Sequence, residues 1–395
     1  MAMDERVLIA GAGPVGLVAA ANLVRGGVPV TVLEAGADLS TESRASTFHP
    51  PTLDMLERLG AAGALIAQGL IAPRFQYRTK RDGVLGQFDF GAIADLTHHP
   101  YRVQCEQSKL TRILHQQLRG TAQFELQFGA EVKDVTQDRT GVEIAIARNG
   151  KTERRSGRWL IGADGARSDV RRAAGIEFPG FTWPERFLVV STPFDFRTVI
   201  PDLDAVSYVA DPTRWHFLLQ IPGLCRVMFP IRSEESDELA LSSDFALSLL
   251  AAVIPGISNY EVAHATLYKV HQRVAKTFQR GRVFLAGDAA HINNPLGGMG
   301  MNGGIHDAIN LTSRLIEIWH DGKAEGELGR YDRQRRLVTL EYIEKQSIQN
   351  KRNLESDGTD FGRSLAEIAA DKWRTYEYLL RVSMIASLRR AQELG

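Results

Sequence analysis

Residues 7–34 read VLIAGAGPVGLVAAANLVRGGVPVTVLE, and this stretch decides the fold around which the rest of the chain is arranged. The apolar run 7–10 predicts a short buried strand. Residues 14–25 have a helical composition that ends at two glycines, and the β-branched run 28–33 predicts a second strand. A strand, a glycine-rich turn, a helix and a strand in this order predict a βαβ unit with a right-handed crossover.

The turn inside this unit has the spacing of a dinucleotide-binding loop. Gly11 allows the tight turn, Gly13 lets a pyrophosphate approach the backbone, and Gly16 lets the helix pack against the strand. Glu34 closes the second strand, where a carboxylate accepts hydrogen bonds from a ribose hydroxyl and repels a 2′-phosphate. The turn by itself does not separate FAD from NAD. The predicted contacts here are Gly11, Gly13, Pro14, Val15, Gly16 and Glu34.

A second stretch, residues 282–311, reads RVFLAGDAAHINNPLGGMGMNGGIHDAINL. A predicted strand ends at Gly287 and Asp288, and a loop with Pro295 and several glycines leads into a helix that we expect to begin at Gly303. Asp288 is placed to hold a polyol such as a ribityl chain. The glycine-rich backbone offers N–H groups to an anionic ring edge. This stretch favours FAD over NAD.

A third stretch, residues 161–172, reads IGADGARSDVRR and again brings an Asp-Gly pair from a strand end into a turn. Asp164 is the carboxylate of this turn. Arg167, Arg171 and Arg172 are candidates to bind the phosphates of a cofactor. A turn with solvated arginines is the equal alternative when this stretch is taken alone.

In their order and spacing, the three stretches resemble the motifs of the single-component FAD-dependent aromatic hydroxylases, the para-hydroxybenzoate hydroxylase-like flavoprotein monooxygenases. The resemblance spans residues 7–336. It implies non-covalent FAD, NADH or NADPH as the reductant, and O2 as a cosubstrate, with hydroxylation through a C4a-hydroperoxyflavin. It implies no protein nucleophile, because the cofactor supplies the chemistry.

The same resemblance implies roles for single residues. Arg44 would reach the flavin or its phosphates, Gln107 would touch the cofactor, and Val132 would contact the adenine side through its backbone. The predicted cofactor contacts beyond the first loop are Arg44, Gln107, Val132, Asp164, Asp288, Gly298, Gly300, Met301 and Asn302. The predicted catalytic residues are Arg44, Pro295 and Gly298. Pro295 and Gly298 would border the reacting ring edge, and Arg44, on the opposite polar loop, would hold the ring in one position.

We expect an α/β fold in which a Rossmann-like FAD-binding domain is interleaved with a β-sheet substrate domain and followed by C-terminal helices. No linker rich in Ser and Pro separates two halves of the chain. The expected boundaries are 1–72, 98–178 and 280–345 for the FAD-binding domain, 73–97 and 179–279 for the substrate domain, and 346–395 for the helical segment.

The β-rich segment 187–231 is expected to cover the flavin and to hold the substrate. Trp215 and Phe217 lie on one face of a predicted strand because side chains alternate along a strand. We name Trp215, Phe217, Arg226 and Pro295 as candidate substrate contacts, with core packing as the competing interpretation. His49, His98 and His99 lack metal-ligand spacing, so we expect no metal and interpret them as loop or surface residues.

Composition argues against several classes of partner and of structure. The 395 residues include 47 basic and 47 acidic side chains, so the net charge is zero and nothing favours nucleic acid or an anionic membrane. Two cysteines exclude a disulfide framework. The apolar run 7–24 is interrupted by glycines and a proline, which argues against a membrane span. We expect a cytoplasmic monomer or homodimer.

The predicted function is hydroxylation of an aromatic substrate, either a phenol or a hydroxylated N-heteroaromatic acid. Two alternatives stay open. A related flavoenzyme would act on a non-aromatic or polyketide substrate, halogenate, or reduce isoprenoid double bonds, although the W-x-W-x-I-P motif of halogenases is absent from the sequence. A non-catalytic FAD-binding protein would bind the same cofactor without consuming NADH or NADPH.

Overall fold

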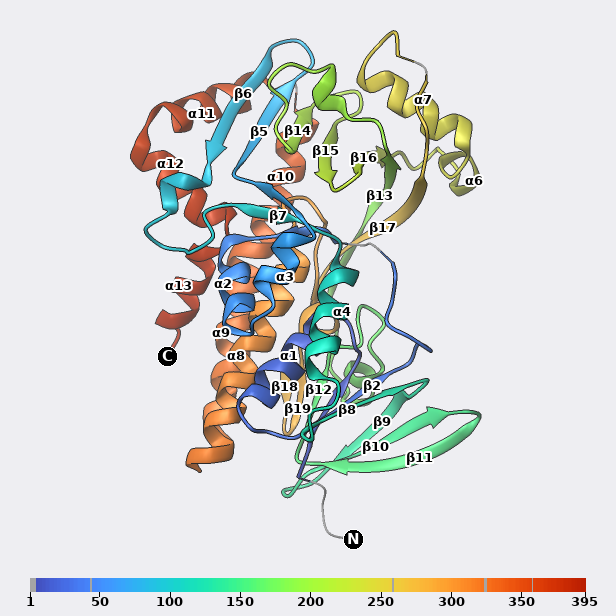
Figure 1. Ribbon diagram of the computed structural model, residues 1–395, viewed down its shortest axis with the longest axis vertical. Helices are drawn as coiled ribbons and strands as arrows, with labels where there is room; N and C mark the ends of the chain where they lie inside the picture. The colour runs from blue at the N-terminus through green and yellow to red at the C-terminus, as the bar shows by residue number, and fades with distance from the viewer. Residues whose placement is uncertain (1–4, 43–44, 258, 323–324, 357) are drawn as a thin grey trace.

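The computed structural model describes residues 5–42, 45–257, 259–322, 325–356 and 358–395. Figure 1 shows an elongated molecule with one β-sheet region near the N-terminus and a second at the opposite end, and the long helix α8 runs beside the first. The last helices of the chain lie along one side and reach both regions.

The N-terminal βαβ unit forms the centre of a six-stranded sheet. β1 (Val7–Ala10) lies between β12 (Trp159–Gly162) and β2 (Val30–Glu34) and pairs in parallel with both. The crossover helix is α1 (Pro14–Arg25). The predicted unit and the α/β fold class are confirmed. The outer strands are β8 (Phe124–Phe128) beside β2, and β19 (Val283–Leu285) and β18 (Gln279–Arg280) beside β12.

An eight-stranded sheet makes up the other region, in the order β20-β17-β13-β16-β15-β14-β5-β6. Its neighbouring strands are antiparallel except for the parallel pair of β14 and β5. The strands are β5 (Arg74–Thr79), β6 (Gly83–Asp89), β13 (Gly180–Thr192), β14 (Val206–Ala210), β15 (His216–Ile221), β16 (Leu224–Ile231), β17 (His264–Val274) and β20 (His291–Ile292).

One short segment joins the two sheets. Residues 283–285 form β19 of the six-stranded sheet, and residues 291–292 form β20 of the eight-stranded sheet. The turn between them contains Gly287 and Asp288, and α8 (Met299–Asp321) follows a few residues later. The segment that the sequence singled out therefore lies at the junction of the two sheets.

Smaller elements complete the framework. Two three-stranded sheets comprise β3 (Thr47–Phe48), β7 (Arg102–Gln104) and β4 (Leu70–Ala72), and β9 (Glu131–Gln137), β10 (Val142–Arg148) and β11 (Lys151–Gly157). The other helices before α8 are α2 (Pro50–Arg58), α3 (Ala62–Ala67), α4 (Gln107–Leu118), α5 (Asp169–Ala173), α6 (Asp237–Ala240) and α7 (Ser243–Val253). The helices after α8 are α9 (Gly329–Val338), a π-helical segment (Thr339–Glu344), α10 (Lys345–Glu355), α11 (Thr359–Ala370), α12 (Lys372–Val382) and α13 (Ile385–Glu393).

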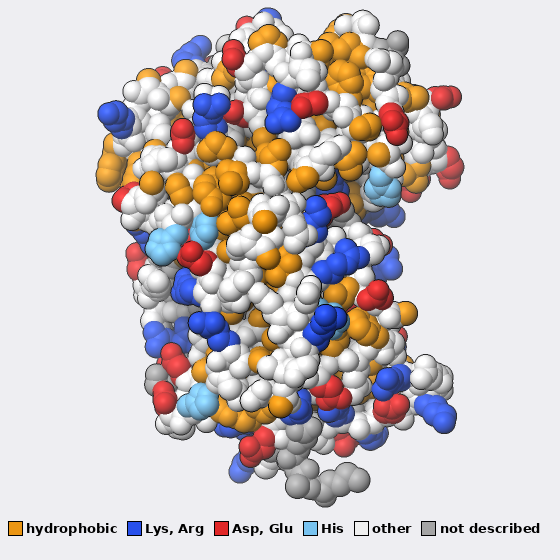
Figure 2. Space-filling view, in the orientation of Figure 1, with side chains coloured by type: hydrophobic (Ala, Val, Ile, Leu, Met, Phe, Trp, Pro, Cys, Tyr) orange, Lys and Arg blue, Asp and Glu red, His pale blue; other side chains and the backbone are white. Residues whose placement is uncertain are grey.

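The surface shows no segregation of charge on the face drawn in Figure 2. Basic and acidic side chains are interspersed there, as equal numbers of the two permit. Across the part of the chain that the structure describes, none of the helices combines the length and the hydropathy that crossing a bilayer requires.

Candidate active site

The glycine turn after β1 is shaped by two close backbone approaches. A Cβ atom at Gly11 would lie 2.5 Å from the carbonyl oxygen of Ala163, and one at Gly16 would lie 2.0 Å from the carbonyl oxygen of Gly11. Gly11 also has a φ of +99°, which L side chains rarely adopt. Gly13 has open space where its Cβ would stand. Gly11 and Gly16 are thus required by packing, whereas Gly13 leaves room for a ligand.

Helix α1 begins directly after this turn with free N–H groups. Pro14 is its first residue, and no side chain caps its N-terminus at Gly13. Glu34 stands opposite at the end of β2, where its two carboxylate oxygens accept hydrogen bonds from the N–H groups of Ala12 (2.7 Å) and Gly36 (2.8 Å). These bonds fix the orientation of the carboxylate and leave lone pairs for a further donor.

Three hollows adjoin one another from this turn to the eight-stranded sheet. The first pocket, of about 330 Å³, and the second pocket, of about 360 Å³, share Gly13, Glu34 and Gly165 in their walls. The third, which we call the cavity, has about 160 Å³ and shares Ala45 and Met301 with the second pocket. Together they form a continuous trough along the carboxyl ends of β1, β2, β12 and β19.

Most of the predicted site residues line this trough. The first pocket is lined by Gly11, Gly13, Glu34, Val132 and Asp164, the second by Gly13, Pro14, Val15, Glu34, Gln107, Asp288 and Met301, and the cavity by Phe217, Arg226, Pro295, Gly298, Gly300 and Met301. Gly16, Trp215 and Asn302 are not in these linings. Arg44 lies outside the described residues.

Asp164 enters the first pocket from the end of β12. One of its oxygens accepts a hydrogen bond from the Val170 N–H at 3.1 Å, and the other is buried with no partner among the described residues. Burial raises the pKa of this carboxyl. A buried acceptor without a partner, facing a hollow, is satisfied by a ligand that carries hydroxyl or N–H groups.

Two of the three arginines that follow Asp164 have partners that the sequence did not reveal. The side chain of Arg171 is buried and donates to the carbonyl oxygens of Ala289 (2.8 Å) and Ala166 (3.0 Å), while Arg172 pairs with Asp169. Arg171 therefore links two turns by hydrogen bonds and does not serve as a phosphate ligand. This corrects the expectation that Arg171 binds the phosphates of a cofactor. Arg167 does line the first pocket.

Helix α8 begins four residues earlier than expected. It starts at Met299, so Gly300, Gly303 and Gly304 lie inside the helix, and of the glycines from 297 to 304 only Gly297 and Gly298 have a positive φ. Close packing requires glycine at two of these helical positions: a Cβ at Gly303 would lie 2.9 Å from the Ile343 side chain, and one at Gly304 would lie 2.6 Å from that of Val15. The expected glycine loop is in fact the uncapped N-terminus of α8, which opens onto the cavity.

The eight-stranded sheet covers the cavity with mostly apolar side chains. They include Val189, Tyr208, Phe217, Leu219 and Met228. Arg226 adds a positive charge; it is buried and donates to the Ser46 hydroxyl at 3.0 Å. The side-chain oxygen of Asn293, on the opposite wall, is buried without a partner among the described residues. The cavity is an apolar chamber with a few polar groups, as small-molecule sites usually are.

Trp215 is absent from the lining of this cavity, so the structure favours core packing, the competing interpretation, for this residue. It precedes β15, is 2% exposed, and packs edge-on against Phe187 with ring centroids 5.2 Å apart. Trp215 and Phe217 belong to the same apolar cluster, as the alternation predicted.

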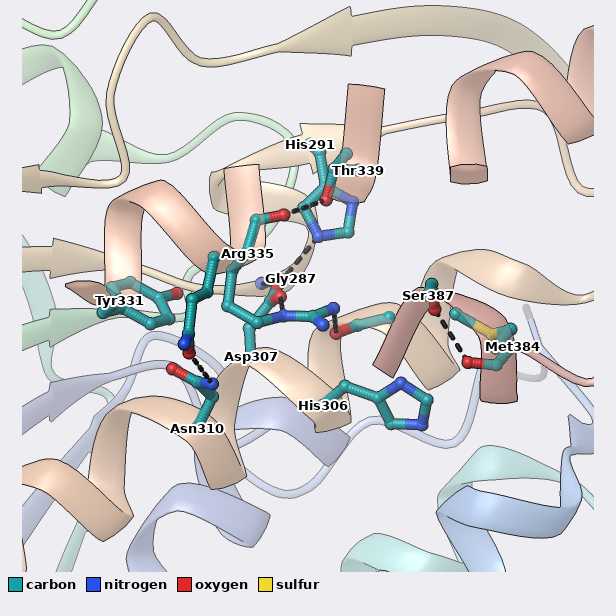
Figure 3. A network of polar contacts seen from close by, with 12 residues as sticks. Gly287, His291, His306, Asp307, Asn310, Tyr331, Arg335, Thr339, Met384 and Ser387 are labelled. Carbon is teal, nitrogen blue, oxygen red and sulfur yellow. Dashed lines mark hydrogen bonds and ion pairs between the residues drawn. The ribbon is translucent and has the colours of Figure 1, made fainter. Parts of the chain in front are cut away.

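A buried polar network lies behind the Gly287–Asp288 turn. Figure 3 shows Asp307 of α8 between His291 and Arg335, which approach from opposite sides. Arg335 belongs to α9, and Tyr331 of the same helix donates to the carbonyl oxygen of Leu285 at the end of β19, at 2.5 Å. The sequence stretch 282–311 contains Asp307 and His291, but no local pattern predicted that α9 completes the network.

The three histidines lie outside helices and strands, as the loop interpretation expected, but two of them are buried. His49 and His99 are buried, and only His98 is exposed. His99 contacts Asp54 at 2.8 Å and His98 contacts Glu57 at 2.9 Å. Ligand atoms of Asp54, Glu57 and His99 lie within 4.8 Å of one another, and the absence of a metal stays a prediction.

Tyr208 is a cavity residue that sequence reasoning missed. It lies on β14, where all five residues are buried. Because both faces of the strand are covered, the alternation of apolar and polar residues that singles out an inward-facing side chain is absent. The stacking of Tyr208 on Tyr77, with ring centroids 5.0 Å apart, depends on the neighbouring strand β5, which is distant in sequence.

These features together fit FAD. The trough offers two uncapped helix N-termini, those of α1 and α8, together with the carboxylates Glu34 and Asp288 and the unsatisfied oxygen of Asp164. Helix N-termini favour the pyrophosphate and an anionic ring edge, and carboxylates favour ribose and ribityl hydroxyls. Gly13 keeps the space that bound phosphates need.

A family model described as "FAD binding domain" matches residues 4–346. The chain therefore belongs to this family of FAD-binding proteins.

Relatives define the class further. The chain is 35% identical over 351 residues to para-nitrophenol 4-monooxygenase of Pseudomonas sp. strain WBC-3, covering 88% of this chain and 86% of that one. It is 34% identical over 359 residues to 6-hydroxy-3-succinoylpyridine 3-monooxygenase of Pseudomonas putida S16, covering 90% of each. The crystal structure of p-nitrophenol 4-monooxygenase from Pseudomonas putida DLL-E4 superposes with a TM-score of 0.91 at 30% identity, over 98% of this chain and 99% of that one. The protein is a flavoprotein monooxygenase of the single-component FAD-dependent aromatic hydroxylases.

Proposed function

We propose that the protein hydroxylates a single-ring phenol or hydroxylated N-heteroaromatic compound with FAD, O2 and either NADH or NADPH. The observation that carries this proposal is the cavity of about 160 Å³ between the N-terminus of α8 and the eight-stranded sheet. An apolar hollow of about 150 Å³ accommodates benzene. The relatives named for a nitrophenol and a hydroxypyridine support this class of substrate.

The side chains around the cavity have distinct parts in the proposal. FAD, when bound and reduced, supplies the activation of O2 that brings one oxygen atom to the ring. Phe217 and Met228 pack against the substrate ring and exclude water. Arg226 places a positive charge beside the cavity, which favours the ionised and more electron-rich form of a bound phenol. Tyr208 offers a hydroxyl to the ring substituent.

The cofactor would be held along the trough. Glu34 binds the adenosine ribose, the N-terminus of α1 binds the pyrophosphate, and Asp288 binds the ribityl chain. The backbone N–H groups at the start of α8, near Gly300 and Met301, stabilise negative charge on the edge of the flavin ring. Pro295 and Gly298 border the reacting ring.

A substrate panel with labelled oxygen tests the proposal. Single-ring phenols, hydroxypyridines and a multi-ring phenol are each supplied with NADH or NADPH under 18O2. We expect a single-ring compound to accelerate oxidation of the reductant and to yield a product that carries one 18O atom. Hydrogen peroxide without labelled product, for every single-ring compound, would contradict the proposal. Turnover of the multi-ring compound alone would favour the polyketide alternative, and no oxidation at all would favour the non-catalytic one.

A further inference from the structure

The turn that contains Gly287 and Asp288 lines the second pocket through Asp288, and a single buried carboxylate binds this turn on the side away from the pocket. Asp307 of α8 is fully buried, and one of its oxygens accepts hydrogen bonds from His291 Nε2 at 2.7 Å and from the Gly287 N–H at 3.1 Å. Its other oxygen accepts from Arg335 Nε at 2.7 Å. Figure 3 shows these three partners converging on Asp307 from β20, the turn and α9.

A small movement of Gly287 would shift the wall of the second pocket. Gly287 directly precedes Asp288, which lines the second pocket. The turn is also tightly enclosed: a Cβ at Gly287 would lie 2.8 Å from the side chain of Val15, and one at Gly304 would lie 2.8 Å from the Gly287 Cα. Val15 stands at the start of α1 and lines the same pocket. The position of Gly287 therefore affects both the Asp288 side and the α1 side of that pocket.

The charges in this network point to orientation rather than to stability alone. Burial by itself raises the pKa of Asp307, but His291 and Arg335 outweigh it and bring that pKa to about 2. Asp307 is therefore ionised at neutral pH. His291 presents its Nε2 to Asp307, and its Nδ1 is buried without a partner among the described residues. Apolar side chains fill such a space at least as stably as a buried ion pair, whereas directed hydrogen bonds fix one geometry.

We propose that Asp307 is a positioning residue for FAD. It is absent from the linings of the pockets and the cavity, and it acts by holding the Gly287 N–H so that Asp288 and the start of α1 face the cofactor. This inference rests on FAD binding, which the family membership establishes, and not on the proposed substrate. Its failure would leave the proposed hydroxylation unaffected, and the converse also holds.

The test measures how fast holoprotein variants release FAD. Asp307→Asn keeps the shape of the side chain, but its amide nitrogen is a donor where one carboxylate oxygen stood. That nitrogen would point at either the Gly287 N–H or the Arg335 guanidinium, and both of these are donors themselves. After dilution of the holoprotein, FAD release is followed by the rise in flavin fluorescence. We expect release to be faster by about tenfold, the scale of losing a hydrogen bond to a charged acceptor.

A matched control separates positioning from simple loss of stability. Thr312 is fully buried on the same helix, where it donates to the Ala308 carbonyl oxygen at 2.6 Å and accepts from Asn22 at 2.8 Å. Thr312→Val should lower the melting temperature and leave the rate of FAD release unchanged. Unchanged release by folded Asp307→Asn, or equal acceleration in both variants, overturns the inference.

A second variant keeps the inference testable if Asp307→Asn does not fold. Arg335→Lys retains the positive charge but loses the directed Nε–H contact to Asp307. With the carboxylate less constrained, we expect FAD release about threefold faster than in the wild-type holoprotein. If Arg335→Lys folds and releases FAD at the wild-type rate, Asp307 does not position the cofactor turn.

Discussion

His49 Nε2 donates a hydrogen bond of 2.8 Å to the carbonyl oxygen of Gly297, and that glycine forms part of the cavity wall. Burial holds the pKa of His49 well below its usual range, so the ring is neutral, and its Nδ1 has no partner in the described part of the chain. Asn302 continues the contact: it accepts from the His49 N–H at 3.0 Å and donates to the carbonyl oxygens of Thr47 and Gly298. These bonds join the two sides of the cavity.

His49→Leu should therefore widen or loosen the cavity and leave the first and second pockets, which His49 does not line, unchanged. The Gly297 carbonyl loses its donor, which costs about 1–3 kcal/mol when the group stays buried. We expect the yield of hydroxylated product per NADH or NADPH to fall and the yield of hydrogen peroxide to rise. His49→Gln, whose amide N–H can donate to the same carbonyl, should recover part of the yield.

The control for this prediction is the second buried histidine at the interface of α2 and α8. His306 contacts the Thr52 hydroxyl at 2.9 Å and lines neither the cavity nor the two pockets. His306→Gln should leave the ratio of product to peroxide unchanged. If it lowers that ratio as much as His49→Leu does, the bond to Gly297 has no special part in shaping the cavity.

Two glycines of the first turn should respond in opposite ways to alanine. At Gly16 a Cβ would stand 2.0 Å from a backbone oxygen, so Gly16→Ala should destabilise the fold by several kcal/mol, on the scale of severe core overpacking. At Gly13 the space is open and φ is −70°, so Gly13→Ala should fold normally and bind FAD more weakly. Thermal unfolding and FAD titration separate the two effects. Equal melting temperatures for both variants would contradict this assignment.

The sequence predicted the features that depend on residues close together in the chain. The βαβ unit follows from apolar runs and glycines that are adjacent in the chain, and β1, α1 and β2 form as expected. Asp164 and Asp288 end parallel strands, and such ends meet at one edge of a sheet. Their placement beside the trough therefore follows from topology, while their roles toward FAD stay predictions.

The misjudged residues depend on packing between segments that are distant in sequence. Gly303 and Gly304 have low helix propensity, yet they lie inside α8, where Ile343 and Val15 approach too closely for any side chain. Trp215 packs in the core against Phe187 and is absent from the cavity lining, a placement that depends on strands distant in sequence. The burial of His49 follows from the packing of α2 against α8, which no local pattern records.

Removing the carboxylate of Glu34 should weaken FAD binding selectively. In the proposed role, Glu34 accepts from the ribose hydroxyl, so Glu34→Ala would remove that acceptor and also free the N–H groups of Ala12 and Gly36. We expect FAD binding weaker by about 1–3 kcal/mol, the scale of a charge-assisted hydrogen bond. Glu125→Ala, which removes an ion pair with Arg155 away from the trough, is the control and should leave FAD affinity unchanged. A folded Glu34→Ala protein with wild-type affinity for FAD would refute the role.

Acid should destabilise the protein through its buried histidines, and His216 allows a clean measurement. Burial, followed by the nearby positive charge of Lys80, lowers the pKa of His216 to about 4, whereas in the unfolded chain it is about 6.5. Between these values the unfolded chain binds the proton and the folded one does not, so the free energy of unfolding falls as pH falls. The loss attributable to His216 is about 3 kcal/mol from pH 6.5 to pH 4.

The comparison variant for this effect is His216→Phe, which keeps an aromatic ring beside Phe229 but cannot take up a proton. His49 and His306 also have lowered pKa values and contribute in the same direction in both proteins. Denaturant unfolding at a series of pH values should therefore show a shallower loss of stability in the variant below about pH 6.5. Parallel curves for the two proteins would mean that His216 becomes protonated in the folded state as readily as in the unfolded chain.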